Sequence, residues 1–277
     1  MDKRPHHIKN KILEASADFK IPEARSESSS WDLLQESIRK REKGNQILLG
    51  NMLKYVAAAS VAILFVVSLA LLHVREVRTS NGEILLVELP DNSTVTLNAS
   101  SQISYNPFLW HFNREISLSG EAFFDVKKGS EFKVWSGDKN VTVLGTSFNI
   151  RARDNSYQVS CFTGKVLVKN DINREVILAP GEKTIDMGDQ LPKISFKASK
   201  TATWRTGDFY FESTSINDVI RELERQFDIE VIFNPEYDRI YTGYFNTQSM
   251  EEALELICAP MGYTYSINSN IVTIESL

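Results

Sequence analysis

The longest uninterrupted run of apolar positions covers residues 55–74 and reads YVAAASVAILFVVSLALLHV. It contains no Asp, Glu, Lys or Arg, and as an α-helix rising ~1.5 Å per residue it matches the ~30 Å hydrocarbon core of a bilayer. A polar segment, residues 1–54, precedes it and no small-residue cleavage site follows, so a cleaved signal peptide fits poorly. The pattern predicts a single transmembrane helix over residues 53–74. The alternative is the buried core helix of a soluble domain, which this length disfavours.

Basic residues are concentrated on the N-terminal side of the apolar run. Arg39, Lys40, Arg41, Lys43 and Lys54 precede it, whereas Arg75 and Arg78 follow it and no further basic residue occurs before Arg114. Cytoplasmic flanks of membrane helices carry the excess of Lys and Arg. The charge bias therefore predicts a cytoplasmic N-terminus and a C-terminus on the opposite side of the membrane.

The segment before the membrane run, residues 1–50, shows two short helical patterns. The first covers Ile8 to Phe19 and ends before Pro22. The second begins after the Ser26–Ser30 run and is expected to end at Gly44, because glycine is common just past the last turn of a helix.

Three residues of the second helical pattern, Trp31, Leu34 and Ile38, form one apolar stripe. Two helices of this length are too small to build a core of their own. The stripe therefore indicates a surface that docks on a partner. The alternative is a juxtamembrane stalk that lies on the bilayer surface.

Residues 79–199 show strand patterns throughout, with no helix-length segment before residue 200. The runs are ILLVELP, STVTLN, QISYN, REISLSG, AFFDVK, FKVWS, VTVLG, SFNIRA, YQVSCF, KVLVK and EVILAP. Pro90-Asp91-Asn92-Ser93, between the first two runs, is a hairpin signal. Strands at this spacing predict an all-β sandwich, barrel or β-roll.

Residues 204–277 contain an internal repeat. Shifting Tyr210–Phe233 forward by 34 positions aligns it with Tyr244–Ile267, and each copy reads as a strand, a helix and a strand. A 34-residue period also fits helical tetratricopeptide arrays, but the aromatic strands around each helix argue against them. Asn268-Ser269-Asn270 then turns the chain into a final strand, IVTIE.

The helix of each copy carries one core-facing stripe. The stripes consist of Ile216, Ile220, Leu223 and Phe227 in the first copy and Met250, Leu254, Ile257 and Met261 in the second. Ser215 with Asp218, and Ser249 with Glu252, are close to capping boxes and are expected to start the two helices.

The charge distribution excludes some function classes. The net charge is −5, and residues 1–54 carry 11 Lys and Arg against 8 Asp and Glu, which leaves 20 against 28 in the remainder. Neither part has a concentrated basic stripe, so nucleic-acid binding is not expected. No CxxC, HExxH or His/Cys cluster suggests a metal, and no cofactor is expected. Cys161 and Cys258 lie in apolar patterns, which favours buried free thiols over a disulfide.

Several motifs occur in a fixed order within residues 79–190. They are LPDNSTVTLNASSQISYNP, ISLSGEAFFDV, VTVLGTSFNIRA, GKVLV and LAPGEK. Together they resemble the FecR family of membrane-spanning anti-sigma factors. The resemblance implies a single-pass inner-membrane protein with a short α-helical cytoplasmic segment over residues 1–50 and an all-β periplasmic FecR domain over residues 79–199. It also implies that Trp31, Leu34 and Ile38 bind an extracytoplasmic-function sigma factor.

The repeat resembles the C-terminal domain found behind FecR modules in Bacteroidetes-type proteins, which is similar to the short N-terminal domain of secretins and TonB-dependent transporters. The resemblance implies a periplasmic α+β domain of duplicated βαβ units over residues 204–277. Its partner would be the N-terminal domain of a TonB-dependent outer-membrane transporter for an iron chelate or a glycan. Ile220, Leu223, Leu254 and Ile257 would form the core of this transporter-contacting domain.

The Gly145-Thr146 bond in VLGTSF is a candidate self-cleavage site. A Thr hydroxyl can attack the preceding carbonyl in an N→O acyl shift, and some FecR-like regulators cleave themselves at a Gly-Thr bond in the corresponding motif. The alternative is a glycine bend between two strands. After an exterior cut, a site-2-type intramembrane protease would enter the helix at Ala57–Ser60. The alternative role of these small residues is close helix packing.

No catalytic constellation is evident, so an enzyme is not expected. His111, in FLWHF, fits a surface or packing role better than general-base chemistry. The second class of function is a membrane-anchored carbohydrate-binding or scaffold protein. It is suggested by Trp110, Trp135 and Trp204, although tryptophans in β-proteins usually belong to the core.

Overall fold

The structure is a computed structural model that describes residues 26–154, 156–234 and 238–276, together with Lys11, Glu14 and Ser16. The chain divides into two compact units, Met1–Val66 and Val67–Leu277. The helix expected over Ile8–Phe19 lies outside the described residues.

One helix, α2, runs from Glu27 to Leu72 without a break. The expectation that Gly44 ends the cytoplasmic helix was therefore wrong. A glycine inside a helix costs only about 1 kcal/mol relative to alanine, and the residues around it are good helix formers. The stripe and the apolar span consequently belong to the same helix.

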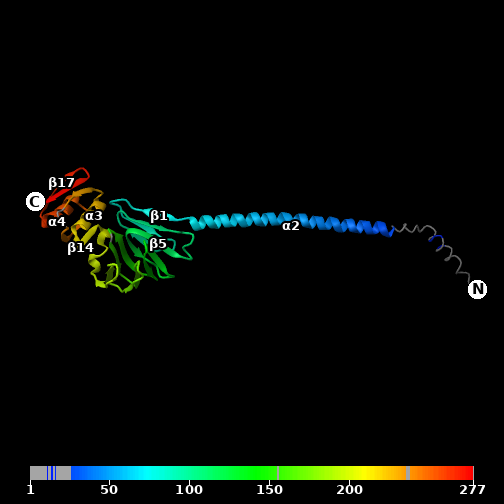
Figure 1. The fold of residues 1–277 in the computed structure, drawn as a ribbon, viewed down its shortest axis with the longest axis horizontal. Helices are drawn as coiled ribbons and strands as arrows, with labels where there is room; N and C mark the ends of the chain where they lie inside the picture. Colours follow the sequence, from blue (N-terminus) through cyan, green and yellow to red (C-terminus); the bar gives the residue numbers. More distant parts are fainter. Residues whose placement is uncertain are drawn as a thin grey trace, which may run out of the picture. The chain divides into compact units, whose positions relative to one another are not determined.

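Beyond α2 the chain forms a two-layer sandwich that is antiparallel except for the parallel pair β5–β6, and it is coloured cyan to green in Figure 1. Its strands are β1 (Arg75–Arg78), β2 (Leu85–Glu88), β3 (Thr94–Leu97), β4 (Gln102–Tyr105), β5 (Arg114–Asp125), β6 (Phe132–Ser136), β7 (Lys139–Val143), β8 (Ser147–Arg153), β9 (Ser156–Cys161), β10 (Val166–Lys169), β11 (Glu175–Leu178), β12 (Glu182–Ile185) and β13 (Ile194–Ser195). The structure thus selects the sandwich from the all-β architectures expected for this region.

Strand β5 belongs to both layers. Its first half pairs with β4 and β6 in layer A, which also holds β1, β7, β10 and β11. Its second half pairs with β3 and β8 in layer B, which also holds β2, β9, β12 and β13. The pattern REISLSG followed by AFFDVK suggested two strands, but they form one. Gly120, with φ +98°, lies where the strand passes from one layer to the other.

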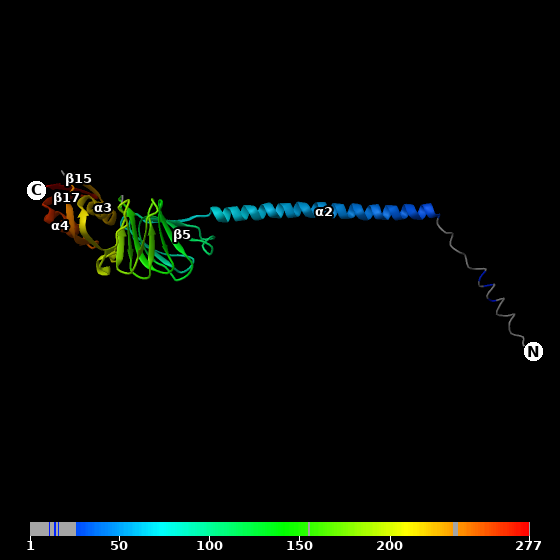
Figure 2. The same cartoon turned by 60° about the horizontal axis from the view of Figure 1, so that its bottom comes forward.

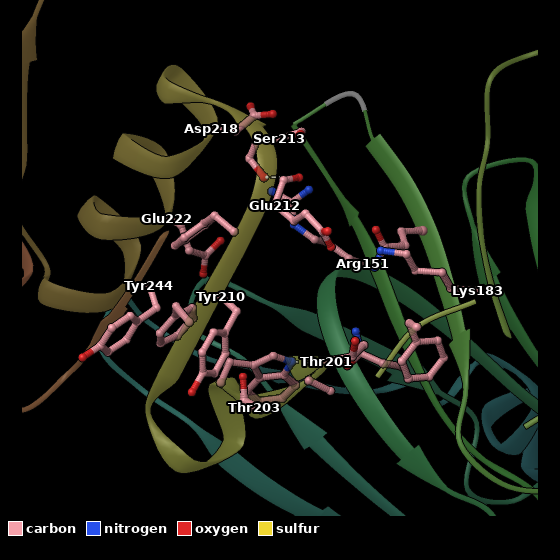
Figure 3. Close-up of a pocket in the computed structure, with 18 of the residues that line it drawn as sticks. Arg151, Lys183, Thr201, Thr203, Tyr210, Glu212, Ser213, Asp218, Glu222 and Tyr244 are labelled. Carbon is pink, nitrogen blue, oxygen red and sulfur yellow. Dashed lines mark hydrogen bonds between the residues drawn. The ribbon is translucent and has the colours of Figure 1, made fainter. Parts of the chain in front are cut away.

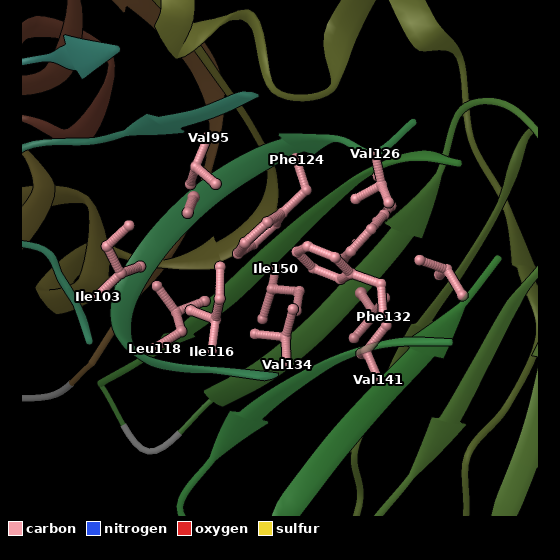
Figure 4. Close-up of a cluster of buried hydrophobic side chains, with 14 of the residues drawn as sticks. Val95, Ile103, Ile116, Leu118, Phe124, Val126, Phe132, Val134, Val141 and Ile150 are labelled. Atoms are coloured by element: carbon pink, nitrogen blue, oxygen red, sulfur yellow. The ribbon is translucent and has the colours of Figure 1, made fainter. Parts of the chain in front are cut away.

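The two layers enclose one apolar core (Figure 4). Phe124 stacks on Phe148 at a ring distance of 4.9 Å and meets Phe132 edge to face at 6.2 Å. These three rings are fully buried and come from β5, β8 and β6, so both layers contribute to the same core.

The repeat folds into a second domain, coloured yellow to red in Figure 1. Its elements are β14 (Asp208–Ser215), α3 (Ile216–Phe227), β15 (Glu230–Phe233), β16 (Ile240–Asn246), α4 (Met250–Met261), β17 (Tyr263–Asn268) and β18 (Ile271–Ser276). Figure 2 shows α3, α4, β15 and β17 together in this domain. We call β14–β18 the repeat domain.

Each copy of the repeat is a strand, a helix and a strand, as expected, but its two strands belong to different sheets. β14 pairs antiparallel with β16, with Phe209 opposite Phe245 and Tyr210 opposite Tyr244. β15 and β17 instead flank β18, parallel on one side and antiparallel on the other. The βαβ copies are therefore not conventional crossovers within a single sheet.

The two helix starts differ. The Ser249 hydroxyl accepts a hydrogen bond from the Glu252 N–H at 3.2 Å, as its capping pattern predicts. Ser215 makes no such side-chain cap and donates to Asp238 at 2.8 Å instead. Both serines are the N-cap residues of their helices, as predicted, but the side-chain cap forms only at α4, because a nearby carboxylate binds the hydroxyl of Ser215.

Candidate functional surfaces

The stripe Trp31, Leu34 and Ile38 is exposed on the N-terminal part of α2. The exposed fractions of these side chains are 61%, 49% and 50%. Their spacing of three and four residues places them on one side of the helix. The structure thus presents an aromatic and aliphatic surface of the kind that binds a partner by helix docking.

The same helix contains the apolar span. Among the described residues, one helical stretch, Met52–Leu72, is long and apolar enough to cross a membrane, with a mean hydropathy of 2.5 over its most apolar part. Its side chains are exposed, unlike those of a core helix. This fits a single-pass membrane protein.

Ile220, Leu223, Leu254 and Ile257 are buried and share one core in the repeat domain. They hold the two helices against the sheets, and their burial prevents direct contact with a partner. Phe123 of the sandwich joins the same core, which shows that the two domains pack against each other.

A cleft of about 1090 Å³ lies between the sandwich and the repeat domain (Figure 3). All residues of β14 line it, and both residues of β13 line it from the sandwich side. Within the described part of the chain, β14 pairs with β16 alone and β13 with β12 alone. Each is therefore an edge strand of its sheet, and both line the cleft.

The cleft walls combine aromatic and charged groups. Tyr210 and Tyr244 stack on each other with ring centroids 5.8 Å apart, and their side chains are 43% and 45% exposed. Arg151 and Lys183 line the sandwich wall, whereas Glu212 lies on β14 of the repeat domain. Such a cleft offers edge strands, aromatic contact and charges of both signs to a protein segment.

A buried charge cluster joins the two domains beside the cleft. Arg153 of β8 lies 3.5 Å from Glu121 and 3.8 Å from Glu222 of α3, measured between nitrogen and oxygen atoms. Arg225 donates to Glu222 at 2.8 Å, and to the two carboxylate oxygens of Asp154 at 2.9 and 3.2 Å. The sandwich thus supplies counter-charges to a helix of the other domain.

Amide groups extend this cluster. Gln226 donates to Asn98 at 3.0 Å, and Asn98 and Asn149 both donate to Glu121, at 3.0 and 2.9 Å. The Trp204 indole N–H then donates to Asn149 at 3.3 Å. Every carboxylate oxygen of Glu121 therefore has a partner although the side chain is buried.

The electrostatics of Glu222 follow from these contacts. Burial disfavours its charged form, but the Arg153 and Arg225 guanidinium groups outweigh that effect and lower the pKa of Glu222 to about 2. Burial in turn lowers the pKa of Arg153, which Glu222 and Glu121 oppose, and an arginine stays charged in either case. Glu222 and the two arginines beside it are therefore charged at physiological pH.

Sequence reasoning did not find this cluster. Glu222 and Gln226 lie beside the apolar stripe of α3 and look like ordinary polar positions. Their exposed fractions are only 4% and 7%, because the sandwich covers them. The sequence contained only a weak signal for this cluster. Glu222 and Gln226 lie four residues apart, next to the apolar stripe of a strongly amphipathic helix.

The Gly145-Thr146 bond lies in the bend between β7 and β8. Gly145 has φ +150°, and a Cβ there would come within 2.7 Å of the Lys128 Cα atom. Close backbone approach therefore requires a glycine at this position in the bend. Thr146 is 3% exposed, and its hydroxyl donates to the Lys165 carbonyl at 3.2 Å.

The other chemical candidates have structural roles. Trp110 and Trp204 are buried, so they cannot form a sugar-binding surface, and Trp135 is half-buried under Lys133. His111 is exposed. Cys161 and Cys258 are both free and buried, as expected, and burial raises the pKa of each thiol to about 11.

Two family models match the chain. The FecR protein model matches residues 75–167, and the model of the FecR C-terminal domain matches residues 208–274. The first ends within the sandwich and the second covers the repeat domain.

Two solved structures of a candidate anti-sigma factor from Parabacteroides distasonis ATCC 8503 are similar to this chain. The structure at 2.50 Å resolution has a TM-score of 0.69 and 30% sequence identity, and the match covers 74% of this chain and 100% of the other. The structure at 1.65 Å resolution has a TM-score of 0.68 and 30% identity, with 73% and 99% covered. No curated protein matches the chain. The chain belongs to the FecR family of anti-sigma factors.

Proposed function

We propose that this protein is a single-pass inner-membrane anti-sigma factor that holds an extracytoplasmic-function sigma factor in the cytoplasm and releases it on a signal from outside. The exposed stripe Trp31, Leu34 and Ile38 carries the proposal, because it lies on the helix that continues into the apolar span. The basic flank before the span supports a cytoplasmic position for the stripe.

The test is co-purification of the full chain with the candidate sigma factors of its host. Leu34→Ala should weaken the complex at least tenfold, because it removes an apolar contact from the stripe. Leu33→Ala is the matched control: Leu33 is 52% exposed but lies about 100° away from Leu34 around the helix. Equal effects of the two substitutions would overturn the stripe as the binding surface.

The repeat domain is proposed to receive the signal from the N-terminal domain of a TonB-dependent outer-membrane transporter. The position of β14 at the edge of its sheet and along the cleft supports this role, because extended segments commonly bind at the edge strands of small sheets. Tyr210 and Tyr244 provide aromatic contact beside it.

A photo-crosslinking amino acid at position 210 tests this contact in living cells. On induction, the Tyr210 variant should form an adduct that mass spectrometry identifies as a TonB-dependent transporter. The control position is Ile232, which is 52% exposed on β15 in the other sheet. A transporter adduct from Ile232 and none from Tyr210 would place the contact elsewhere.

Release is proposed to occur by proteolysis, because a single helix has no second helix to move against. An exterior cut, at Gly145-Thr146, would be followed by an intramembrane protease of the site-2 type entering at Ala57–Ser60. An N-terminally tagged chain should therefore shorten on immunoblots when the inducing nutrient is added. A full-length band that persists throughout sigma activation would exclude cleavage.

The chemistry at Thr146 has its own test. Thr146→Ala should abolish the exterior cut, and Thr146→Ser should preserve it because serine keeps the hydroxyl nucleophile. An exterior cut that persists in Thr146→Ala would show that another protease makes it.

A further inference from the structure

The loop between β4 and β5, residues 106–113, is fastened to the C-terminal end of the apolar span. The Asn106 side-chain amide donates to two carbonyls in the last turn of α2, those of Ala70 and Leu71, at 3.1 and 3.0 Å. The ring of His73, which follows α2, meets Phe108 edge to face at 5.3 Å. The loop therefore lies at the level where the span ends.

The loop is a built structure that directs apolar side chains outward. The Asn106 side-chain oxygen accepts hydrogen bonds from the N–H groups of Phe108 and Leu109, at 2.9 and 3.1 Å. Trp110 is buried and packs edge to face on Tyr105 and Phe132. With the middle of the loop anchored in this way, Phe108 remains 59% exposed and Phe112 89% exposed.

Two further loops reach the same end of the sandwich. β6 starts opposite Arg114, where β5 also starts, and β7 ends opposite Phe132. The β5–β6 loop carries the exposed side chains of Lys127 and Lys128. The β7–β8 bend carries Leu144, which is 64% exposed and whose carbonyl accepts from the Gly129 N–H at 2.9 Å.

These loops are neighbours in space. His111 and Lys128 line one small pocket of about 220 Å³ together with Arg114. The end of the sandwich that adjoins the span thus combines three exposed apolar side chains, Phe108, Phe112 and Leu144, with two lysines.

We propose that this end of the sandwich rests on the bilayer through which α2 passes, with Phe108, Phe112 and Leu144 in the interfacial layer and Lys127 and Lys128 among the lipid phosphates. Aromatic rings favour the membrane–water interface, and lysine side chains extend their charge toward anionic headgroups. We choose the bilayer as the partner because Asn106 of the loop is hydrogen-bonded to the last turn of the apolar span. Lipids that surround the last turn of α2 would therefore lie next to these side chains.

The test uses the full chain in nanodiscs of phosphatidylcholine and phosphatidylglycerol, with or without bromine near the top of the acyl chains. Bromine quenches tryptophan on contact, so the emission that Phe112→Trp adds to the parent chain reports lipid contact. Ile172→Trp is the control, because Ile172 is 54% exposed in the β10–β11 turn at the opposite end of layer A. Both sites are exposed, so neither substitution threatens the fold.

Brominated lipid should remove most of the emission added by Phe112→Trp and leave that of Ile172→Trp unchanged. Lys127→Glu together with Lys128→Glu should reduce the quenching at position 112 in discs rich in phosphatidylglycerol. Equal, weak quenching at both positions would overturn the proposal. A second outcome would also overturn it. In that outcome brominated lipid would not quench the tryptophan at position 112, but its emission would shift to shorter wavelengths as the number of chains per disc rises. The surface would then bind a second copy of the chain instead of lipid.

Discussion

Glu222 is an acidic residue whose compensating charge comes largely from another domain. Arg153 belongs to the sandwich, and Arg225, although on the same helix, is held by Asp154 of the sandwich. Removing the Glu222 carboxylate would leave two guanidinium groups close together in a buried place. A local substitution should therefore act on the contact between domains.

Glu222→Gln is expected to lower the free energy of unfolding of the chain beyond the membrane by about 3 kcal/mol, because breaking a buried ion pair strands its partners. Urea denaturation of the detergent-solubilised chain measures it. Glu255→Gln on the exposed side of α4 is the matched control and should change the value by less than about 0.5 kcal/mol. Equal effects would contradict the role assigned to the cluster.

The lowered pKa of Glu222 predicts a pH dependence. Its folded-state pKa of about 2 lies below the ordinary value of 4.5, so its contribution is complete above about pH 4.5 and is lost as the pH falls toward 2. The parent chain should therefore lose roughly 3 kcal/mol more than Glu222→Gln over that interval. Asp91 and Asp186 also have lowered pKa values, so the difference between the two chains isolates Glu222. Parallel pH profiles would contradict this.

At the scale of the elements, the sequence predicted those features that follow from the spacing of apolar residues and from turn residues. The stripes of α3 and α4, the Pro90–Ser93 hairpin and the Ser269-Asn270 turn are present as expected. β1 was not predicted, because Arg75–Arg78 has no apolar alternation and forms a strand by pairing with β4. The helix end predicted at Gly44 was wrong, because α2 continues through this glycine. A glycine ends a helix only where the chain leaves the helical conformation.

The helical stripes support a stability prediction. Leu223→Ala and Ile257→Ala should each cost about 2–5 kcal/mol, because both side chains are fully buried in the core of the repeat domain. Ile232→Ala, at a position 52% exposed, should cost much less and serves as the control. Thermal unfolding monitored by circular dichroism measures all three. A cost at Ile232 as large as at Ile257 would show that the assigned core is wrong.

The bend of β5 supports a second stability prediction at this scale. A Cβ at Gly120 would lie 2.8 Å from the Ser101 Cα atom, and φ is +98° there. Gly120→Ala should therefore cost about 3 kcal/mol or more, from backbone strain and steric overlap together. Gly137→Ala, where a Cβ meets nothing within 4 Å and φ is +61°, should cost only about 1–2 kcal/mol. Equal losses in chemical denaturation would argue against close approach at the bend.

At the scale of the whole molecule, the contact between sandwich and repeat domain was beyond sequence reasoning. Arg225 and Asp154 are 71 residues apart, and Gln226 and Asn98 are 128 apart. A single sequence gives no signal for such pairs, because each member looks like a solvated polar residue. The candidate surfaces were more accessible: the stripe of α2 was predicted, whereas the cleft along β14 depends on how the two domains pack.

Asp154→Asn tests whether the charge cluster couples the two domains. Asp154 contacts Arg151, Arg221 and Arg225 and has φ +55°, a conformation that asparagine tolerates well. Calorimetry of the parent chain should show one unfolding transition beyond the membrane, and the variant should show two. Asp138→Asn, at an exposed turn, should leave the single transition intact. A single transition in Asp154→Asn would show that apolar contacts alone couple the domains.

The pairing of β14 with β16 follows a rule of symmetry. Tyr210 and its counterpart one repeat later, Tyr244, face each other, while Phe209 faces Phe245 and Phe211 faces Gly243. Phe209 thus faces the counterpart of Phe211, and Phe211 faces the counterpart of Phe209, so the pairing is reciprocal. This is the isologous contact of a twofold homodimer, contained here within a single chain. The described residues of the first copy contain no counterpart of β18, which breaks the symmetry in the second sheet. A polypeptide that carried one copy alone would present a self-complementary edge and would be expected to assemble as a pair.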